Sequence, residues 1–367
     1  MIWIVLAMVV FVAYTNGAND NFKGVATIYG SKSASYRSAL TWATVMQLAG
    51  SLAATTLAGG LVATFSARGL LPDAIAVSPA FMTAAAAATA ATVLLATLLG
   101  LPVSTTHALT GGLVGAGLVA VGISGMRFGV LGKSFLLPLG LSPLLAMGIT
   151  MILYPLARTS RRALGVERES CVCVGQEIVP LRLAGGASAA ASVAVTMSTG
   201  TTQECVDRYQ GTVVGVSAQR VLDVLHFGSA GAICFARALN DTPKILALAL
   251  AAKAVGAPFG LSLIGAAMAV GGILNARKVA ETMSQKITPL NAGQGFVANA
   301  TTAALVIAAS RAGLPVSTTH LATSGIFGIG VVNRTARARV IGGILAAWVT
   351  TLPLAAAVGA LAYLALR

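Results

Sequence analysis

The sequence predicts an all-α polytopic membrane protein built from two inverted-topology repeats of about five membrane segments each. Three observations predict this fold: an extreme apolar composition, a pair of motifs that occurs twice in the same order, and an uneven distribution of Lys and Arg between the predicted loops. Hydrophobic residues make up 56% of the 367 residues, and charged residues make up only 9%. Such a composition is typical of a protein embedded in a lipid bilayer.

Long uncharged runs recur along the chain and are predicted to be helices. A helix needs about 20 apolar residues to cross the hydrocarbon layer, and these runs lack the polar–apolar alternation of a membrane β-barrel. The first run has no A-x-A cleavage pattern after it, so we expect a mature helix rather than a signal peptide. We predict ten crossings, or about 10 to 12 segments depending on how broken helices are counted. The crossings are 1–31, 38–65, 79–99, 101–121, 134–157, 221–252, 254–275, 289–310, 313–333 and 340–366.

The strongest signal in the sequence is an internal repeat. Residues 100–117 read GLPVSTTHALTGGLVGAG and residues 313–330 read GLPVSTTHLATSGIFGIG, so 12 of 18 positions match, eight of them in a row. Upstream of each copy, NGANDNFKG at 16–24 and RALNDTPKI at 237–245 share Asn-Asp-x-x-Lys. We therefore divide the chain into an N-terminal membrane repeat, a polar central region that forms a cytoplasmic loop or small unit, and a C-terminal inverted repeat. Their bounds are 1–157, 158–220 and 221–367.

The orientation of the halves follows from the number of crossings and from the basic residues. An odd number of crossings per half turns the second half upside down relative to the first. Twelve Lys and Arg residues then fall on the side of the central region and six on the other, which favours a cytoplasmic central region and both termini outside a plasma (inner) membrane. Inverted repeats are typical of alternating-access transporters, whose sites lie near the membrane midplane.

The net charge of +14 is explained by basic cytoplasmic loops and does not indicate a nucleic-acid partner. Of the four cysteines, Cys171 and Cys173 form a Cys-x-Cys pair without a second pair at zinc-site spacing. We expect reduced thiols without a function.

Two acidic residues, Asp20 and Asp241, lie deep inside apolar segments. An ionised carboxylate at the centre of a membrane helix costs about 2.5 to 3.5 kcal/mol on insertion scales, so it needs a partner. One interpretation is a structural ion pair with the lysine three residues along, Lys23 or Lys244. The other is a site for a small hard cation such as Na⁺ beside helix breaks at Gly17 and Pro243, and the duplication favours it. Its ligands would be Asn19, Asp20, Asn240 and Asp241.

The repeated LPVSTTH motif predicts an anion site. Pro102 and Pro315 disrupt the helix around them, so that hydroxyls and free backbone N–H groups can face a polar cavity and bind an oxyanion. Bridging of helices by Ser and Thr is the alternative. The hydroxyls belong to Ser104, Thr105, Thr106, Ser317, Thr318 and Thr319. His107 and His320 either orient the loop or carry a proton, and a structural role is slightly favoured.

Gln294 and Asn299 are polar residues in the segment before the second motif. Their counterparts 213 residues upstream are Phe81 and Ala86, so the predicted site is not fully symmetric. We expect this asymmetry to distinguish substrate ligands from cation ligands.

The sequences NGANDNFKG, ALNDTPK and the paired GLPVSTTH resemble those of the PiT family of inorganic phosphate transporters. The resemblance implies a secondary active transporter that imports phosphate by symport with Na⁺ or H⁺. Phosphate would bind the six motif hydroxyls with Lys23, Lys244, Gln294 and Asn299, and the cation would bind the Asn-Asp pairs. Two positions depart from the family pattern: ALND replaces GAND, and Asn-Phe-Lys follows Asp20 where Val-Ala-Asn is common.

Electrostatics explains why a cation should be coupled to the anion. A phosphate dianion about 5 Å from an ionised Asp is repelled by roughly 6 to 7 kcal/mol at an effective dielectric of about 20, so both aspartates must be neutralised before phosphate binds. Cation and anion then raise each other's affinity. The sequence leaves Na⁺, H⁺ and a metal–phosphate complex open as the coupled species.

Other functions are less well supported by the sequence. A sulfate or other tetrahedral-oxyanion permease on the same scaffold is the nearest alternative, and a passive anion channel is disfavoured because acidic residues line an anion pore poorly. Hydrolase signatures and a nucleotide-binding P-loop are absent, so neither an enzyme nor an ATP-driven pump is expected. The expected partners are phosphate, the coupling cation and the lipid bilayer, with no cofactor; a homodimer is one option.

Overall fold

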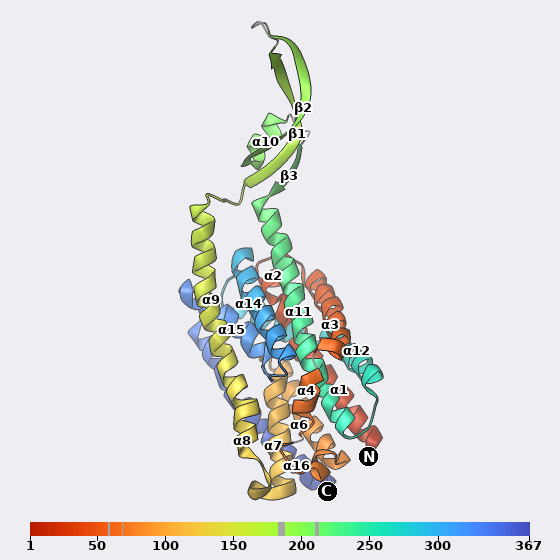
Figure 1. Ribbon diagram of the computed structural model, residues 1–367. Coiled ribbons are helices and arrows are strands. Elements are labelled where there is room, and N and C mark those ends of the chain that lie inside the picture. Colours follow the sequence, from red (N-terminus) through yellow and green to blue (C-terminus); the bar gives the residue numbers. More distant parts are fainter. Residues whose placement is uncertain (58, 68, 183–187, 210–212) are drawn as a thin grey trace. The chain divides into compact units, whose positions relative to one another are not determined.

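The computed structural model of the protein describes residues 1–57, 59–67, 69–182, 188–209 and 213–367 (Figure 1). The chain forms two compact units, one made of Met1–Tyr154 with His226–Arg367 and the other of Pro155–Leu225. The first is called the membrane unit here and the second the central unit. The polar region 158–220 of the sequence lies inside the central unit.

Helices form nearly all of the membrane unit. Its first half contains α1 (Ile2–Asp20), a 3₁₀ turn (Lys23–Val25), α2 (Ala26–Gly30), α3 (Tyr36–Leu57), α4 (Gly59–Phe65), α5 (Asp73–Ala76), α6 (Pro79–Leu98), α7 (Thr105–Gly125), α8 (Phe128–Val130), a π-helical turn (Leu131–Leu136) and α9 (Leu137–Ala163). Its second half contains α11 (Ala218–Ala251), α12 (Ala257–Asn275), α13 (Arg277–Glu281), a π-helical turn (Thr282–Lys286), α14 (Ala292–Arg311), α15 (Thr318–Val332) and α16 (Ala338–Leu366). The outer ends of α9 and α11 belong to the central unit.

These helices confirm the predicted all-α membrane fold. Within the described residues, eight helical segments are long and apolar enough to cross a bilayer, and the bent pair formed by α3 and α4 makes a ninth. The tenth predicted crossing corresponds to α15, which has 15 residues and is the shorter apolar helix of the second half. Each of the ten predicted crossings therefore has a helical counterpart.

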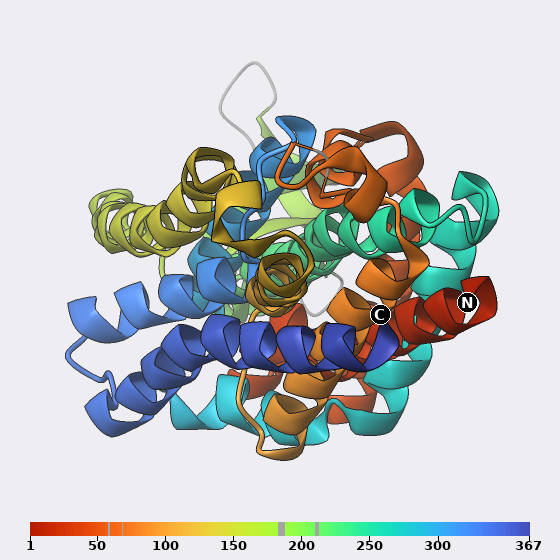
Figure 2. The same cartoon turned by 90° about the horizontal axis from the view of Figure 1, so that it is seen from below.

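The two helices that carry the Asn-Asp motifs, α1 and α11, run in opposite directions through the membrane unit (Figure 1). The N- and C-termini lie at the same end of this unit, which Figure 2 views end-on. From that end α1 leads away, whereas α11 returns to it before the turn into α12 (Figure 1).

Helices of one half pack closely on helices of the other. In the membrane unit α1 packs against α12, and α7 packs against α16. Glycine permits this approach, because a Cβ atom built at Gly17 would lie 1.8 Å from the Met268 carbonyl oxygen and one at Gly115 would lie 1.8 Å from that of Ala356. Small residues at such contacts are the usual means by which helices associate in lipid.

The helix breaks lie only partly where the sequence placed them. Both proline-containing stretches before the Ser-Thr-Thr motifs are non-helical, so α7 begins at Thr105 and α15 at Thr318. In the first Asn-Asp motif, Gly17 lies inside α1, so the break comes after Asp20 and not at Gly17 as predicted. The predicted break at Pro243 is wrong, since α11 continues through this residue. Its surroundings explain this: residues 236–249 of α11 are buried, and such tertiary packing can hold a helix together across a proline.

The central unit is built on a three-stranded antiparallel sheet. Its elements are β1 (Ser170–Arg182), β2 (Ser188–Thr201), α10 (Thr202–Arg208) and β3 (Val213–Ser217), with strand order β2-β1-β3. A capping box starts α10, in which Thr201 accepts from the Glu204 backbone N–H and Glu204 accepts from that of Thr201.

A disulfide between Cys173 of β1 and Cys205 of α10 joins strand and helix. The expectation that all cysteines are reduced thiols is therefore wrong for this pair. The spacing of cysteines did not reveal it because β1 and α10 meet only after β2 has folded back on β1. Cys171 and Cys234 are free and buried.

Candidate functional site

The duplicated motifs meet inside the membrane unit. The Asn-Asp motif of each half lies on α1 or α11, and each Ser-Thr-Thr motif lies at the start of α7 or α15. Side chains of the two halves bond directly, because Lys23 donates to Thr319 and Lys244 donates to Thr106. Residues almost 300 positions apart in the chain thus form one polar cluster.

The ammonium of Lys23 is held by four oxygen atoms. Lys23 Nζ donates to Asn19 Oδ1 at 2.7 Å, to the Val103 carbonyl at 2.9 Å and to Thr319 Oγ1 at 2.7 Å. It also forms an ion pair with Asp20 Oδ1. The Lys23 side chain is only about 1% exposed.

The ammonium of Lys244 has the equivalent four partners. Lys244 Nζ donates to Asn240 Oδ1, to the Val316 carbonyl at 2.9 Å and to Thr106 Oγ1 at 2.8 Å. Asp241 Oδ1 lies 3.3 Å away as its ion-pair partner. An amide, a carboxylate, a backbone carbonyl and a hydroxyl from the opposite half surround each lysine.

The second oxygen of each carboxylate also has donors. Asp20 Oδ2 accepts from Asn16 at 3.0 Å and from Thr105 Oγ1 at 3.3 Å. Asp241 Oδ2 accepts from Thr318 Oγ1 at 3.3 Å and from Asn16 at 3.5 Å. Asn16 therefore links the two aspartates.

The first serine of each motif has a local role. Ser104 Oγ accepts from the backbone N–H of His107, and Ser317 Oγ accepts from that of His320, both at 3.1 Å. These bonds cap α7 and α15 and fix where their N-termini begin. The two helix N-termini, with their partial positive charge, then lie beside the lysine–aspartate pairs.

The two histidines form a stack behind the motifs. The ring centroids of His107 and His320 are 4.4 Å apart, and His320 stacks on Trp348 at 3.8 Å. His107 Nδ1 lies 2.9 Å from Ser104 Oγ. Trp348 donates its indole N–H to the carbonyl of Pro102, so the stack ties α16 to the first proline break.

The structure keeps Gln294 and Asn299 apart from this cluster. Gln294 forms a capping box with Asn291 at the start of α14 and donates to Tyr154 at 3.1 Å. Asn299 donates to Thr27 Oγ1 at 2.8 Å. Among the residues that the structure describes, neither side chain is hydrogen-bonded to the Asn-Asp or Ser-Thr-Thr motifs.

Sequence reasoning missed Arg237, which adds a third positive charge. Its side chain is 2% exposed, with Nη1 4.0 Å from Asp20 Oδ2 and Nη2 donating to Asn21 at 3.4 Å. The signal was present, since Arg237 is the first residue of the second motif copy and matches Asn16 in the first.

A matched pair of hydroxyls on α6 and α14 was also missed. Asn19 Nδ2 donates to Thr97 Oγ1 at 2.9 Å, and Asn240 Nδ2 donates to Ser310 Oγ at 2.8 Å. These hydroxyls orient the amides so that each Oδ1 faces its lysine. Thr97 and Ser310 are 213 residues apart, the same offset as the Ser-Thr-Thr copies, so extending the repeat upstream would have found them.

The buried charges of the cluster do not cancel. Within the described part of the chain, the buried Asp, Lys and Arg side chains are those of Asp20, Lys23, Arg237, Asp241 and Lys244. With the three cations protonated and both carboxylates ionised, the net charge is +1. An interior with excess positive charge and hydroxyl donors is suited to an anion.

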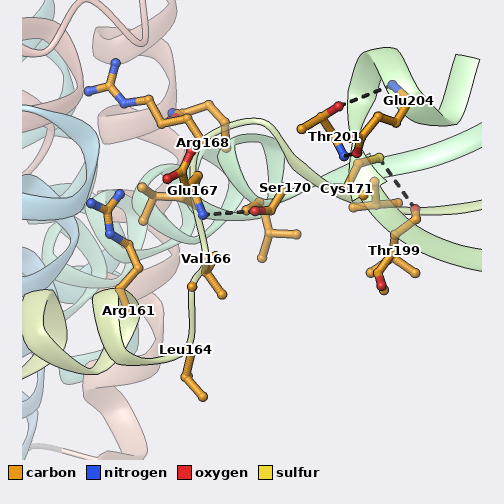
Figure 3. A pocket seen from close by; sticks show the side chains of 18 of the residues that line it. Arg161, Leu164, Val166, Glu167, Arg168, Ser170, Cys171, Thr199, Thr201 and Glu204 are labelled. Carbon is orange, nitrogen blue, oxygen red and sulfur yellow. Dashed lines mark hydrogen bonds between the residues drawn. The ribbon is translucent and has the colours of Figure 1, made fainter.

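A cavity lies in the central unit and differs in chemistry from the polar motif cluster. It measures about 890 Å³ and is lined largely by apolar atoms between the end of α9, the sheet and the start of α11. Figure 3 shows Arg161, Glu167 and Arg168 beside it, with the Glu167 backbone N–H donating to Ser170 Oγ at 2.9 Å. None of the duplicated motif residues lines it.

Comparison with known proteins finds relatives of the kind that the motifs indicated. A chain called "Probable low-affinity inorganic phosphate transporter" from Mycobacterium tuberculosis (strain ATCC 25618 / H37Rv) is 28% identical over 358 residues, which cover 95% of this chain and 74% of that protein. A protein of the same description from Rhizobium meliloti (strain 1021) is 28% identical over 379 residues, covering 98% of this chain and 95% of the relative.

A solved structure, "The sodium-dependent phosphate transporter", has the same fold. It superposes with a TM-score of 0.77 at 22% sequence identity and covers 100% of this chain and 98% of its own. The model of the phosphate transporter family matches residues 16–359, a range that includes both motif pairs, and the family consists of transporters rather than enzymes. The match confirms the resemblance that the motifs indicated: this multi-pass membrane protein belongs to the phosphate transporter family.

Proposed function

We propose that the protein is a secondary active transporter that imports inorganic phosphate by alternating access, with its binding site at the interface of the two halves. The observation that carries this proposal is the buried cluster at their interface, where three cationic side chains exceed two carboxylates and Ser-Thr-Thr hydroxyls from both halves converge. A tetrahedral oxyanion needs several convergent donors and a compensating charge, and this cluster supplies both. The names of the relatives support phosphate as the anion.

Different motif residues are proposed to bind the phosphate and the coupled cation. Phosphate binds to the hydroxyls of both Ser-Thr-Thr motifs and to Lys23 and Lys244, and Gln294 and Asn299 tune what is carried from a neighbouring layer. The proposed cation ligands are the side-chain oxygens of Asn19, Asp20, Asn240 and Asp241. The bonds between the halves support this assignment, because substrate and ion sites of inverted-repeat transporters lie near the membrane midplane at the interface of the repeats.

Coupling to a cation, Na⁺ or H⁺, is the second part of the proposal. We propose that the import proceeds across a plasma (inner) membrane, with the central unit in the cytoplasm and both termini outside. The excess of Lys and Arg on one side supports this orientation. The fold shared with a sodium-dependent transporter supports coupling of transport to a cation.

Purified full-length protein in proteoliposomes tests the function. Labelled phosphate uptake is measured with a Na⁺ gradient, with a proton gradient and with neither. Accumulation above equilibrium with one of the gradients is expected. Equilibration without accumulation under all three conditions would instead indicate a passive anion pathway.

Competition identifies the anion. Unlabelled arsenate, which has the shape and charge of phosphate, is expected to suppress labelled uptake about as strongly as unlabelled phosphate, because the same donors hold both. Sulfate is expected to compete weakly. Stronger suppression by sulfate than by phosphate would identify a sulfate permease on the same scaffold.

A further inference from the structure

The two lysine ammonium groups lie where a dehydrated cation would be coordinated. Each is surrounded by a carboxylate, an amide oxygen, a backbone carbonyl and a threonine hydroxyl. Hard cations such as Na⁺ take oxygen ligands of these kinds, and carbonyls freed at a helix break are typical members of such sites. Six of these contacts have donor–acceptor distances between 2.7 and 3.3 Å, which suit an ammonium N–H.

The two oxygen shells are duplicates of each other. Asn19, Asp20 and Val103 around Lys23 correspond to Asn240, Asp241 and Val316 around Lys244. The hydroxyl is exchanged between halves, with Thr319 completing the first shell and Thr106 completing the second. A chance ion pair would not reproduce four ligand types in both halves. The arrangement is therefore that of two equivalent cation shells, each with a lysine in place.

A free cation cannot share these shells with the lysines. The ammonium is a compact charge with three donors, and both lysine side chains are at most 2% exposed. Na⁺ at the same oxygens would have to displace the amine and leave a buried positive charge without partners.

Charge balance leads to the same conclusion. The two lysines compensate the two aspartates one for one, and Arg237 brings the cluster to a net +1. The carboxylates are thus already neutralised, so no mobile cation is needed to remove their repulsion of an anion. The electrostatic reason for binding Na⁺ is absent from this cluster.

We propose that Lys23 and Lys244 are tethered substitutes for two coupling sodium ions, so that anion binding and uptake require no Na⁺. The inference rests on the proposed phosphate transport and narrows it, because it removes Na⁺ from the coupled species that the sequence left open.

The wild-type protein gives the first test. Labelled phosphate uptake into proteoliposomes is measured under a fixed proton gradient with Na⁺ or with choline as the only monovalent salt cation. The two rates are expected to agree within about twofold, since a site without sodium linkage has no coupling free energy to lose. A loss of about tenfold or more in choline overturns the proposal. Absence of uptake in both salts contradicts phosphate transport itself, so the two failures are distinguishable.

A double variant provides the converse test. Lys23→Asn with Lys244→Asn removes both amines and leaves the oxygen shells, so phosphate uptake and binding are expected to become dependent on Na⁺ by about tenfold or more. Lys286→Asn, at an exposed lysine outside the cluster, is the matched control and should stay independent of Na⁺.

Binding of radioactive Na⁺ to the purified proteins does not depend on turnover. Phosphate-enhanced sodium binding is expected in the double variant and not in the wild type. If the double variant is folded, as shown by a monodisperse elution profile in detergent, and binds no more sodium than wild type, the assignment of the lysine positions as cation sites is overturned. If the double variant does not fold, the wild-type salt comparison still decides the proposal.

Discussion

At the scale of single residues, the charges of the cluster are symmetric except at the position shared by Asn16 and Arg237. Asn16 bridges the two aspartates as a neutral donor, whereas Arg237 approaches Asp20 with a full charge. The guanidinium Nε has no hydrogen-bond partner among the described residues. A buried donor without a partner lowers the stability of the folded protein. This N–H is free to donate to a bound oxyanion.

Arg237→Asn should therefore weaken phosphate binding more than it slows turnover. Removing the charge takes the cluster from +1 to neutral, and we expect the KM for phosphate to rise about tenfold, which corresponds to about 1.4 kcal/mol. The measurement is the concentration dependence of labelled phosphate uptake. Arg277→Asn, at an exposed arginine paired with Glu281, serves as the control. An unchanged KM in Arg237→Asn would assign the residue to structure alone.

The aspartates lead to a different expectation. Asp20→Asn or Asp241→Asn leaves a buried lysine without its counter-charge, which costs about 3 to 5 kcal/mol when a buried pair is broken. We expect gradient-driven uptake to be abolished while the protein still reaches the membrane, measured by uptake together with immunoblots of the membrane fraction. Normal gradient-driven uptake in both variants would exclude these carboxylates from the mechanism.

At the scale of elements, the starts of α7 and α15 are fixed by their serine caps. Ser104→Ala and Ser317→Ala each remove one side-chain acceptor for a helix N–H and should destabilise the protein by about 1 kcal/mol. A lower thermal unfolding midpoint in detergent is the readout. Ser262→Ala removes an exposed hydroxyl that donates to the Pro258 carbonyl inside α12, and it should leave the midpoint nearly unchanged. Equal shifts in all three would argue against a capping role.

Glycine contacts between elements predict opposite effects for two equally small substitutions. Gly115→Ala places a methyl group against the α16 backbone and should destabilise by about 1 to 3 kcal/mol through overpacking. Gly148→Ala meets no atom within 4 Å and should stabilise α9 by about 0.5 to 1 kcal/mol, since alanine is the better helix former. Thermal unfolding of the two variants side by side measures the difference. A stabilising shift in Gly115→Ala would show that the α7–α16 contact leaves room for a methyl group.

At the scale of the whole molecule, the disulfide raises a question about the central unit. Stable disulfides are rare in the cytosol, while the distribution of Lys and Arg predicts that this unit is cytoplasmic. We expect protein purified without reductant to take up two maleimide labels per chain after unfolding, on Cys171 and Cys234, and four after reduction. Intact mass spectrometry counts the labels. Four labels without reduction would show that Cys173 and Cys205 are thiols in the isolated protein.

Sequence reasoning worked where the information was local or duplicated. Apolar runs predicted ten segments because bilayer thickness imposes a length, and the repeat located the Asn-Asp and Ser-Thr-Thr motifs because both copies share their letters. It failed for Pro243, where tertiary packing outweighs a local helix breaker. It also failed for the strands of the central unit, since the pairing of Ser170 with Thr201 depends on a partner about 30 residues away that no local pattern specifies.

The glycine contacts also bear on how a duplicated transporter can move. Besides α1 with α12 and α7 with α16, Gly50 of α3 lies against the Phe235 carbonyl of α11, and Gly328 of α15 lies against that of Met147 in α9. Each of these four close contacts between a glycine and a backbone carbonyl joins a helix of one repeat to a helix of the other. Moving the two repeats apart as rigid bodies would break all four contacts together. The rigid bodies of a conformational cycle should therefore be mixed bundles that each contain helices of both repeats, and the gene duplication boundary should not coincide with a hinge.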